Sequence, residues 1–482
     1  MISRMMNKRY LQMLPWSYAV LTGSLLLRYP VMMFFYKQPY ATPGWIVAAE
    51  LLSIAAGIAL GKLWKDKAFL TMLLFLLLLI GRVLVRSPEQ AWGSRETYFY
   101  ALWAICGCYG LGRALNERQI QVFLMWFTAL WVFAITLHAS IGLYAAWNQQ
   151  VIWNIPAWGR WGLGVINGDA SDVGRDMRLY LIFYPTISGA FLCVSALLAS
   201  HGFICSETRA AKVFYAVCAG ILLIAMALTD TRTANICFAL GMGGFVLLHS
   251  RNIPYERIRV SFPGWKVCFT LLFAIIMVFL CILLPGILNE LFNHTRTSGT
   301  LITHAMAEAS GSNTASVANR GYFGSNALSG RPAIWQAVIK FLLDHPKYLL
   351  MGTSVIGPMN WINPVPGLSY EVEHAHNIFL QVLLESGIPG LLLLVMFVMI
   401  IGVRAFRMVR KPDLAEWIRG IPVIAVSAWI GELVECIYRF ERFILPLCAL
   451  MFLFAGIIGT AGKRNEKNSF YCNKGKNGQK GT

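Results

Sequence analysis

Residues 378–403 read IFLQVLLESGIPGLLLLVMFVMIIGV and form a long apolar run in the last quarter of the chain. At about 1.5 Å of rise per residue, a helix of this length would extend about 39 Å, more than a hydrocarbon core of about 30 Å. Gly387, Pro389 and Gly390 interrupt the run, and proline removes a backbone donor while glycine lowers helix stability. We therefore predict a membrane helix that bends here, with its first half along the outer boundary of the bilayer.

Similar apolar blocks recur along the 482-residue chain, which is 57% hydrophobic and only 13% charged. Soluble domains carry about 25% charged residues, so the composition argues against that class. A helix needs roughly 20 apolar residues to cross a membrane. The sequence predicts an all-α polytopic membrane protein with about twelve transmembrane helices, near residues 16–36, 44–61, 68–85, 97–113, 120–142, 179–200, 213–230, 232–250, 267–288, 378–403, 418–438 and 442–461.

Lysine and arginine positions predict the orientation of these helices. Of the 41 basic residues, 25 fall in the two termini and in the alternate connections that would share one side of the membrane with them. Because short cytoplasmic loops are rich in such residues, we expect cytoplasmic N- and C-termini in a bacterial inner membrane. The first helix is too long for a signal peptide and is expected to be retained. The net charge of +18 then indicates topology, and no nucleic-acid partner is expected.

The eleven cysteines lie almost all in apolar blocks or inward segments. Their spacing fits neither a disulfide framework nor a zinc site. We predict packing roles for them, and no metal or cofactor.

This topology leaves two long segments on the outer side, residues 143–178 and 289–377. Connections of such length are usually functional. The predicted organisation is therefore helices 1–9 in residues 1–288, a large extracytoplasmic loop in 289–377 between helices 9 and 10, helices 10–12 in 378–461, and a basic cytoplasmic tail in 462–482.

The second half of the large loop has an ordered pattern. Pro332 suits the first turn of a helix, and His345-Pro346 would end that helix. Its apolar positions follow helical spacing, at Ile334, Trp335, Val338, Phe341 and Leu342.

Two histidines and two glutamates stand at the end of this loop, in Glu371-Val372-Glu373-His374-Ala375-His376-Asn377. A histidine can take a proton near neutral pH, and a neighbouring carboxylate can hold its ring in the useful tautomer. This composition favours acid–base chemistry at the membrane surface. A solvated polar entry to the next helix is the alternative.

His376-Asn377, followed after nine residues by Gly387-Ile388-Pro389-Gly390, resembles the signature of the O-antigen ligase and O-antigen polymerase superfamily. Ser329-Gly330-Arg331, Trp335 and His345-Pro346 stand where that family has a Gly-Arg, a Trp and a Pro in its large outer loop. The resemblance covers roughly residues 180–460 and is specific between 329 and 390.

The resemblance implies a fold of the membrane glycosyltransferase C type. It also implies a metal-independent, inverting glycosyltransferase that joins a glycan carried on undecaprenyl diphosphate to an acceptor hydroxyl. The acceptor class, whether glycan, lipid or protein, stays open, and so does the choice among ligase, polymerase and protein glycosylation. These substrates and the surrounding membrane lipid are the expected partners.

Leaving-group stabilisation requires cations and the acceptor hydroxyl requires a base. Arg232 and Arg331 both stand at predicted helix starts, where arginine and exposed amides suit phosphate oxygens. A lipid-headgroup anchor is the alternative for Arg232. His376 is the expected base, and His374 is its neighbour or alternative.

Four further residues are predicted to bind substrate: Asn377, Trp335, Glu432 and Glu435. The two glutamates, one helical turn apart, would line the acceptor side or form ion pairs. The tryptophans of residues 143–178 would form a membrane belt or stack on sugar rings.

A transporter or lipid-linked glycan flippase is the competing class, with Glu50, His138, Glu432 and Glu435 as a proton path. Transporters usually show repeated halves, and the chain shows no such repeat. For Glu50, Arg82 and His138 we expect positions that reach the membrane interface. A metal-dependent oligosaccharyltransferase would carry paired acids in the first outer loop, and residues 37–43 have none.

Overall fold

The computed structural model describes most of the helical chain, and three predicted features lie outside its described residues. These are the span at 267–288, the first half of the large loop and the tail at 462–482. The described residues are 2–32, 44–86, 95–147, 154–155, 159–160, 162–164, 178–181, 185–229, 231–250, 331–353, 362, 365, 372, 374–411, 413–435 and 445–461.

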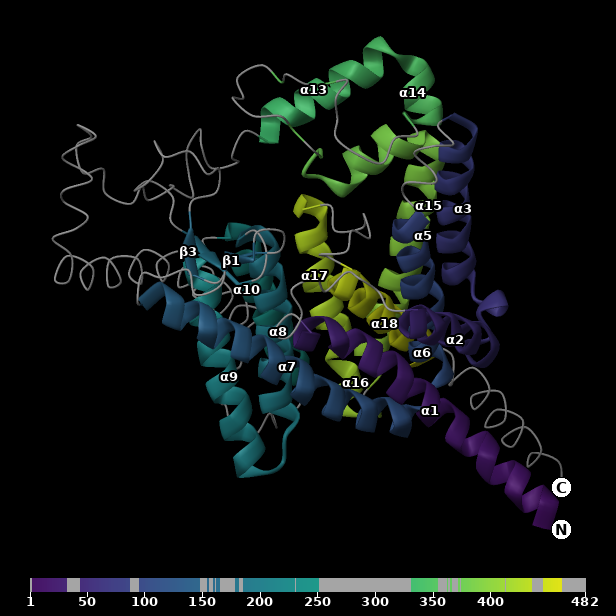
Figure 1. Ribbon diagram of the computed structural model, residues 1–482, viewed down its shortest axis with the longest axis vertical. Coiled ribbons are helices and arrows are strands. Elements are labelled where there is room, and N and C mark those ends of the chain that lie inside the picture. Colours follow the sequence, from purple (N-terminus) through teal and green to yellow (C-terminus); the bar gives the residue numbers. More distant parts are fainter. Residues whose placement is uncertain are drawn as a thin grey trace, which may run out of the picture.

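These residues form helices, together with four strands of two or three residues (Figure 1). The helices are α1 (Ile2–Met32), α2 (Gly44–Gly61), η1 (Leu63–Lys65), α3 (Lys67–Arg86), α5 (Arg95–Leu102), η2 (Trp103–Cys108), α6 (Tyr109–Ala114), α7 (Glu117–Trp147), α8 (Pro185–Cys205), α9 (Arg209–Leu228), α10 (Arg232–Ser250), α13 (Arg331–Asp344), α14 (Pro346–Met351), α15 (Ile378–Val409), α16 (Glu416–Arg419), α17 (Ile421–Glu435) and α18 (Leu445–Ala461). The strands are β1 (Asn154–Ile155), β2 (Gly159–Arg160), β3 (Gly162–Gly164) and β4 (Arg178–Tyr180). The strands pair antiparallel, β1 with β2 and β3 with β4.

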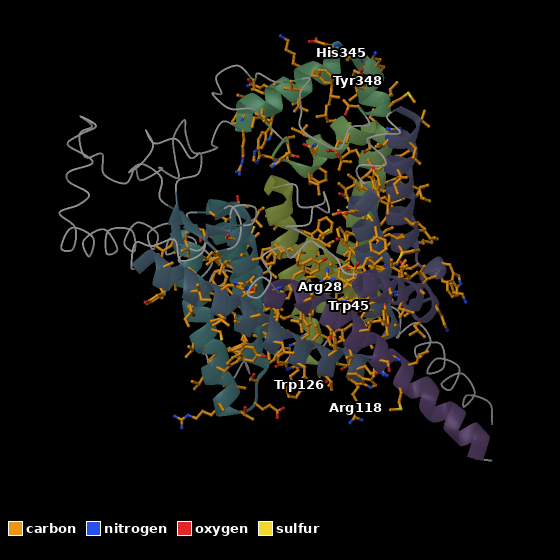
Figure 2. All side chains as sticks on the ribbon, in the orientation of Figure 1. Arg28, Trp45, Arg118, Trp126, His345 and Tyr348 are labelled. Carbon is orange, nitrogen blue, oxygen red and sulfur yellow. The ribbon has the colours of Figure 1, made fainter. Side chains whose placement is uncertain are left out.

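Six of the described helices, α2, α3, α7, α8, α9 and α15, are long and apolar enough to cross a membrane. Large apolar side chains are exposed on the outside of these helices, among them Trp45 and Trp126 (Figure 2). Such a surface is unusual for a soluble monomer and fits contact with lipid. The chain is therefore a multi-pass membrane protein, and the count of twelve stays a prediction.

One predicted span begins too early. Residues 179–200 were expected to form one helix, but Arg178–Tyr180 is strand β4 and α8 begins only at Pro185. The apolar residues just before Pro185 resemble a span in composition, whereas a proline favours the first turn of a helix over its interior. Apart from the four short strands, the described fold is helical, as predicted.

Close helix crossings hold the first half of the bundle together. A Cβ added at Gly110 would lie 2.6 Å from the Cα of Gly57, so α2 and α6 touch through their backbones. Small residues permit such contact between membrane helices, where packing rather than the hydrophobic effect drives association.

The predicted bend in the helix after the large loop is confirmed. Within α15, Gly387 adopts φ 65° and ψ −171°, which is outside helical geometry. Figure 1 shows the helix changing direction between its first section and the long section that packs beside α3. The first section places the residues before Ile378 beneath α13.

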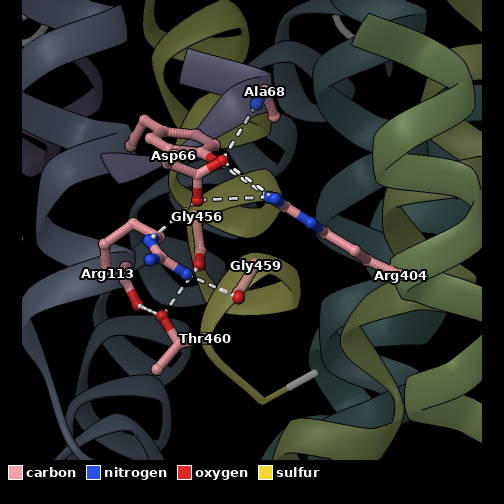
Figure 3. A network of polar contacts seen from close by, with 9 residues as sticks. Asp66, Ala68, Arg113, Arg404, Gly456, Gly459 and Thr460 are labelled. Carbon is pink, nitrogen blue, oxygen red and sulfur yellow. Dashed lines mark hydrogen bonds and ion pairs between the residues drawn. The ribbon is translucent and has the colours of Figure 1, made fainter. Parts of the chain in front are cut away.

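An ion-pair network links the opposite end of α15 to three other parts of the chain (Figure 3). The Asp66 side chain is fully buried between α2 and α3. Its Oδ1 and Oδ2 accept hydrogen bonds from Arg404 at 2.9 and 3.2 Å, and Oδ2 lies 3.1 Å from Nε of Arg113. The Ala68 backbone N–H donates to Oδ1 over 2.9 Å. We call Asp66, Arg113 and Arg404 the Asp66 network.

The Asp66 network also reaches α18, since Arg113 donates to the carbonyl of Gly459 over 2.5 Å. The connections at 62–67, 113–119 and 404–419, which were predicted to lie on the inward side, therefore meet each other and the end of the last predicted span. The fold therefore places these connections on one side of the helix bundle. That this side faces the cytoplasm stays a prediction.

Two residues that were expected to reach the membrane interface are buried inside the protein. Glu50 is 0% exposed and its carboxylate lies 3.4 Å from the Arg28 guanidinium. His138 is also 0% exposed, and its Nε2 lies 2.6 Å from the carbonyl oxygen of Pro30. The expectation failed because nearby polar groups at the end of α1 give both side chains a partner away from the lipid.

Candidate functional site

The ordered half of the large loop builds its own small core above the membrane bundle. Ile334, Val338 and Leu342 on one face of α13 are buried, as the helical spacing predicted, and they pack with Val372 and Leu384. Trp335 and Phe341 cover the edge of this core. Helix α13 is thereby fixed on the first section of α15 and on the chain that leads into it.

Helix α13 ends at Asp344, as predicted, and Pro346 begins a further short helix, α14, that was not predicted. His345 and Tyr348 lie at the outer edge of the molecule in Figure 2, far from Arg28. His345 stacks near Phe341, with ring centroids 4.8 Å apart. His345 is exposed and is separate from the histidines before α15.

His374 and His376 lie next to each other just outside α15. Their ring centroids are 4.0 Å apart, and both residues are half-buried. His376 has φ 46°, a left-handed conformation that is uncommon for residues other than glycine. This backbone turn brings together two rings that lie two positions apart in the sequence. Such left-handed residues persist where the surroundings fix them, often at functional sites.

Ala375, between the two histidines, is fixed from both sides of its peptide backbone. Its carbonyl oxygen accepts a hydrogen bond of 2.9 Å from Nε1 of Trp335. Its N–H donates over 2.6 Å to Oε1 of Gln381, one turn into α15. The alanine side chain is fully buried in the small core. Trp335, predicted to contact substrate, thus has a structural contact with the histidine segment.

The Gln381 amide is held in turn by Glu385. Nε2 of Gln381 donates to Oε1 of Glu385 over 2.6 Å, and both side chains are buried. Sequence reasoning missed this pair, although a spacing of four residues places them on one face of a helix. Their polarity inside an apolar run was the available signal.

Asn377 is the N-cap of α15. Its Oδ1 accepts hydrogen bonds from the N–H groups of Phe379 at 3.0 Å and Leu380 at 3.2 Å. These donors would otherwise lack a partner inside the helix. A contact between Asn377 and substrate, which stays a prediction, would use the amide nitrogen.

Both arginines predicted at helix starts are found there. Arg331 is the first residue of α13 and is half-buried, one turn before Trp335. Arg232 is the first residue of α10, and its side chain lies outside the described atoms. In Figure 1 the turn from α8 to α9 lies at the lower end of the bundle, so α10 begins at the upper end, the side that carries α13.

A clamp that the sequence did not reveal joins the loop to the bend of α15. Nη1 of Arg82, on α3, donates to the carbonyl oxygens of Met351 and Ser386. The N–H of Thr353 donates to the carbonyl of Leu384 over 2.7 Å. These N–H groups donate to carbonyl oxygens near the bend of α15, where Gly387 and Pro389 interrupt the helical hydrogen bonds. Arg82 is half-buried and contacts the loop side, and its expected position at the membrane interface stays a prediction.

Two glycines with positive φ let α14 and α15 meet at this clamp. Gly352 has φ 71° and Gly387 has φ 65°. A Cβ at Gly387 would lie 2.5 Å from the carbonyl oxygen of Leu350 and 2.8 Å from the nitrogen of Gly352. The contact thus requires glycine at Gly387 for space as well as for conformation.

The side chains of the remaining predicted site residues are not described by the structure. Glu432 and Glu435 lie in the last turn of α17, and their side chains are outside the described atoms. Glu371 and Glu373 also lie outside the described residues. Their roles stay predictions.

Taken together, the described atoms place an imidazole pair, a capped helix start and a half-buried guanidinium within one small outer unit. An imidazole can accept a proton from a hydroxyl. A guanidinium and the amides at a helix start favour phosphate oxygens. Among the residues that the structure describes, no group of three or more His, Cys, Asp and Glu side chains could hold a metal ion.

Comparison with known proteins supports the same segment. Residues 217–395 match a family model described as O-antigen ligase, whereas no curated protein matches the chain. The matched segment runs from α9 into α15 and includes Arg232, Arg331, Trp335 and His374-Ala375-His376. Glu432 and Glu435 lie beyond it. The match supports the predicted resemblance to the O-antigen ligase and polymerase superfamily over residues 217–395.

Proposed function

We propose that the protein transfers a glycan from undecaprenyl diphosphate to an acceptor hydroxyl at the outer face of the cell membrane. The observation that carries this proposal is the held histidine segment. Ala375 is anchored by Trp335 and Gln381, so the two imidazoles project from a fixed backbone beneath α13. A rigid support of this kind suits a base that must meet a hydroxyl in one geometry.

In this proposal His376 takes the proton of the acceptor hydroxyl as its oxygen attacks the anomeric carbon. Arg232 and Arg331, with the amides at the starts of α10 and α13, stabilise the negative charge that develops on the departing diphosphate. Attack opposite the leaving group inverts the anomeric configuration. His374, with its ring 4.0 Å from that of His376, is the neighbour that influences the base. The proposed reaction uses no metal ion.

The proposed architecture is of the membrane glycosyltransferase C type, with about twelve transmembrane helices and the active site outside the cytoplasm. The donor is a lipid, so α15 and the bundle below the site would hold its chain within the bilayer. Ligase, polymerase and protein glycosylation share the proposed chemistry and differ in the acceptor, which is a glycan, a lipid or a protein.

The test uses cells that lack the protein and are complemented with the wild type, His376→Ala or Arg331→Ala. We expect each variant, at wild-type abundance in the membrane, to leave lipid-linked glycan untransferred. Chain length on the accumulated carrier and on the acceptor separates the subtypes. Loss of a polymerase leaves single repeat units on the acceptor, whereas loss of a ligase leaves long chains on the carrier.

Wild-type transfer by both variants would contradict the proposed site. Uncoupler-sensitive accumulation of substrate in vesicles, with no covalent product, would instead support a transporter.

A further inference from the structure

We propose that Gln381 and Glu385 are positioning residues that hold the His374–His376 segment in its active geometry. Neither side chain belongs to the residues assigned above to proton transfer or to the diphosphate. The inference rests on the proposed function, and it adds two residues from inside the apolar part of α15.

The order of donors and acceptors in this chain of contacts is fixed by chemistry. The backbone N–H of Ala375 can only donate, so the Gln381 atom 2.6 Å away must be its amide oxygen. The amide nitrogen of Gln381 then faces Glu385, whose Oε1 accepts over 2.6 Å. Glu385 therefore selects the one orientation of Gln381 that can hold Ala375.

Burial makes each of these contacts strong. Gln381 is 1% exposed, Glu385 is 2% exposed and Ala375 is fully buried. Water is therefore a poor substitute for any partner, and an unsatisfied group at this depth is costly. The series of contacts from Ala375 through Gln381 to Glu385 is stable because each polar group has a hydrogen-bond partner in the next residue.

The contacts at Ala375 control the histidines through the backbone. His376, which follows Ala375 directly, adopts φ 46°. Trp335 holds Ala375 from its other side, through the carbonyl oxygen. Without the Gln381 contact, the segment can relax toward the more favourable right-handed region. The His374 and His376 rings would then separate, although α15 itself would remain a membrane helix.

Four size-conserving variants test this inference in the purified full-length protein in liposomes. Gln381→Leu removes both contacts, and Glu385→Leu removes the contact that orients Gln381. Glu385→Gln keeps an acceptor oxygen. The double variant Gln381→Glu/Glu385→Gln keeps the contact with Ala375 and reverses the polarity of the contact between positions 381 and 385, because the new carboxylate accepts from Ala375 and from the new amide.

Two readouts are compared. The first is transfer of glycan from undecaprenyl-diphosphate-linked glycan extracted from wild-type membranes. The second is hydrogen exchange of the peptide that contains residues 372–377, measured by mass spectrometry. Thr71→Val is the matched control, since Thr71 is buried in α3 and its hydroxyl donates to the backbone carbonyl of Lys67 in the same helix.

We expect kcat to fall about 100-fold in both leucine variants, with KM changed less than about threefold, because a misplacement of 1 Å can cost that factor. Exchange at Ala375 should rise about tenfold or more, as expected for loss of a protecting contact. Glu385→Gln and the double variant should stay within about tenfold of the wild-type kcat. Thr71→Val should match the wild type in both readouts.

Wild-type kcat in the leucine variants, or a double variant as impaired as Gln381→Leu, would overturn the inference. Unchanged exchange at Ala375 would overturn it as well. Leucine suits a membrane helix, so the leucine variants are expected to insert. If either fails to insert, the double variant still tests the inference. A wild-type protein that transfers no glycan would refute the proposed function, whereas the exchange readout would still decide whether Gln381 anchors the segment.

Discussion

The histidine segment above α15 and the Asp66 network at its other end are both built from polar groups held by helices, but they differ in what surrounds the charge. Asp66 is fully buried, and its oxygens meet two arginines and a backbone N–H. In the histidine segment the backbone is anchored, while the two rings remain half-buried. The first arrangement is closed and joins helices. The second keeps reactive groups accessible on a fixed support.

This difference predicts different consequences of substitution. Changes at the outer unit should reduce the rate of transfer in a protein that still folds. Changes at the Asp66 network should reduce stability, with little effect on the rate per folded molecule. The variants below test that separation from the largest expected effect to the smallest.

Arg331→Ala should lower transfer about 10³-fold, which is the upper range for loss of one group that stabilises developing charge. Arg331→Lys should recover part of the rate, because lysine keeps the charge without the bidentate geometry. The measurement is the initial rate in liposomes at equal amounts of folded protein. Lys340→Ala, on the exposed face of the same helix, is the control. An equal loss in both alanine variants would assign the effect to α13 rather than to Arg331.

Asp66→Asn should lower the free energy of unfolding by about 3 kcal/mol, since removal of one partner leaves buried charges without compensation. Thermal unfolding in detergent measures the loss, and the transfer rate per folded molecule should stay within about twofold. Asp413→Asn, at an exposed aspartate in the connection after α15, is the control. A large rate loss with unchanged stability would contradict the separation of the two regions.

Gly387→Ala should cost about 2 kcal/mol of stability, because the residue has φ 65° and a Cβ would lie 2.5 Å from the Leu350 carbonyl oxygen. It should also reduce transfer, since α14 and the bend of α15 can no longer meet. Thermal unfolding and initial rates are the measurements. Gly402→Ala is the matched control in the same helix, because its added Cβ would meet nothing within 4 Å. Equal behaviour of the two variants would show that the close contact is unimportant.

The smallest expected effect is the acid dependence of stability. Burial alone would raise the pKa of Asp66, but hydrogen bonds from Arg404 and the charges of Arg113 and Arg404 outweigh it and hold the pKa below its ordinary value of 3.8. The stabilisation is therefore present above about pH 4 and is lost as the pH falls through the lower folded pKa. The wild type should lose about 1 kcal/mol more than Asp66→Asn over this range. Parallel unfolding curves below pH 4 would contradict this.

The outer unit was largely predictable because its signals are local. Pro332 indicated the start of α13, and the apolar spacing after it identified the buried face. Asn377 before an apolar run and the glycines around Pro389 indicated the start and bend of α15. The His-Asn spacing indicated the family, which the match to residues 217–395 supports.

Contacts between distant parts of the chain could not be predicted. Asp66 and Arg404 are 338 positions apart, and Arg82 and Ser386 are 304 apart. Nothing in the local composition indicates which charges will pair when the helices pack. The start of the span at 179–200 was wrong for a local reason, since the apolar residues just before Pro185 resemble a span in composition, whereas α8 begins only at Pro185.

The most direct test of the central claim compares two histidines of one protein. Purified His376→Ala and His345→Ala are reconstituted in liposomes, and transfer is measured from undecaprenyl-diphosphate-linked glycan of wild-type membranes. The account predicts a fall of about 10²–10⁴-fold for His376→Ala, the range for loss of a general base, and a rate within about twofold of wild type for the exposed His345. Equal rates in both variants would contradict the claim that the anchored histidine segment carries the chemistry.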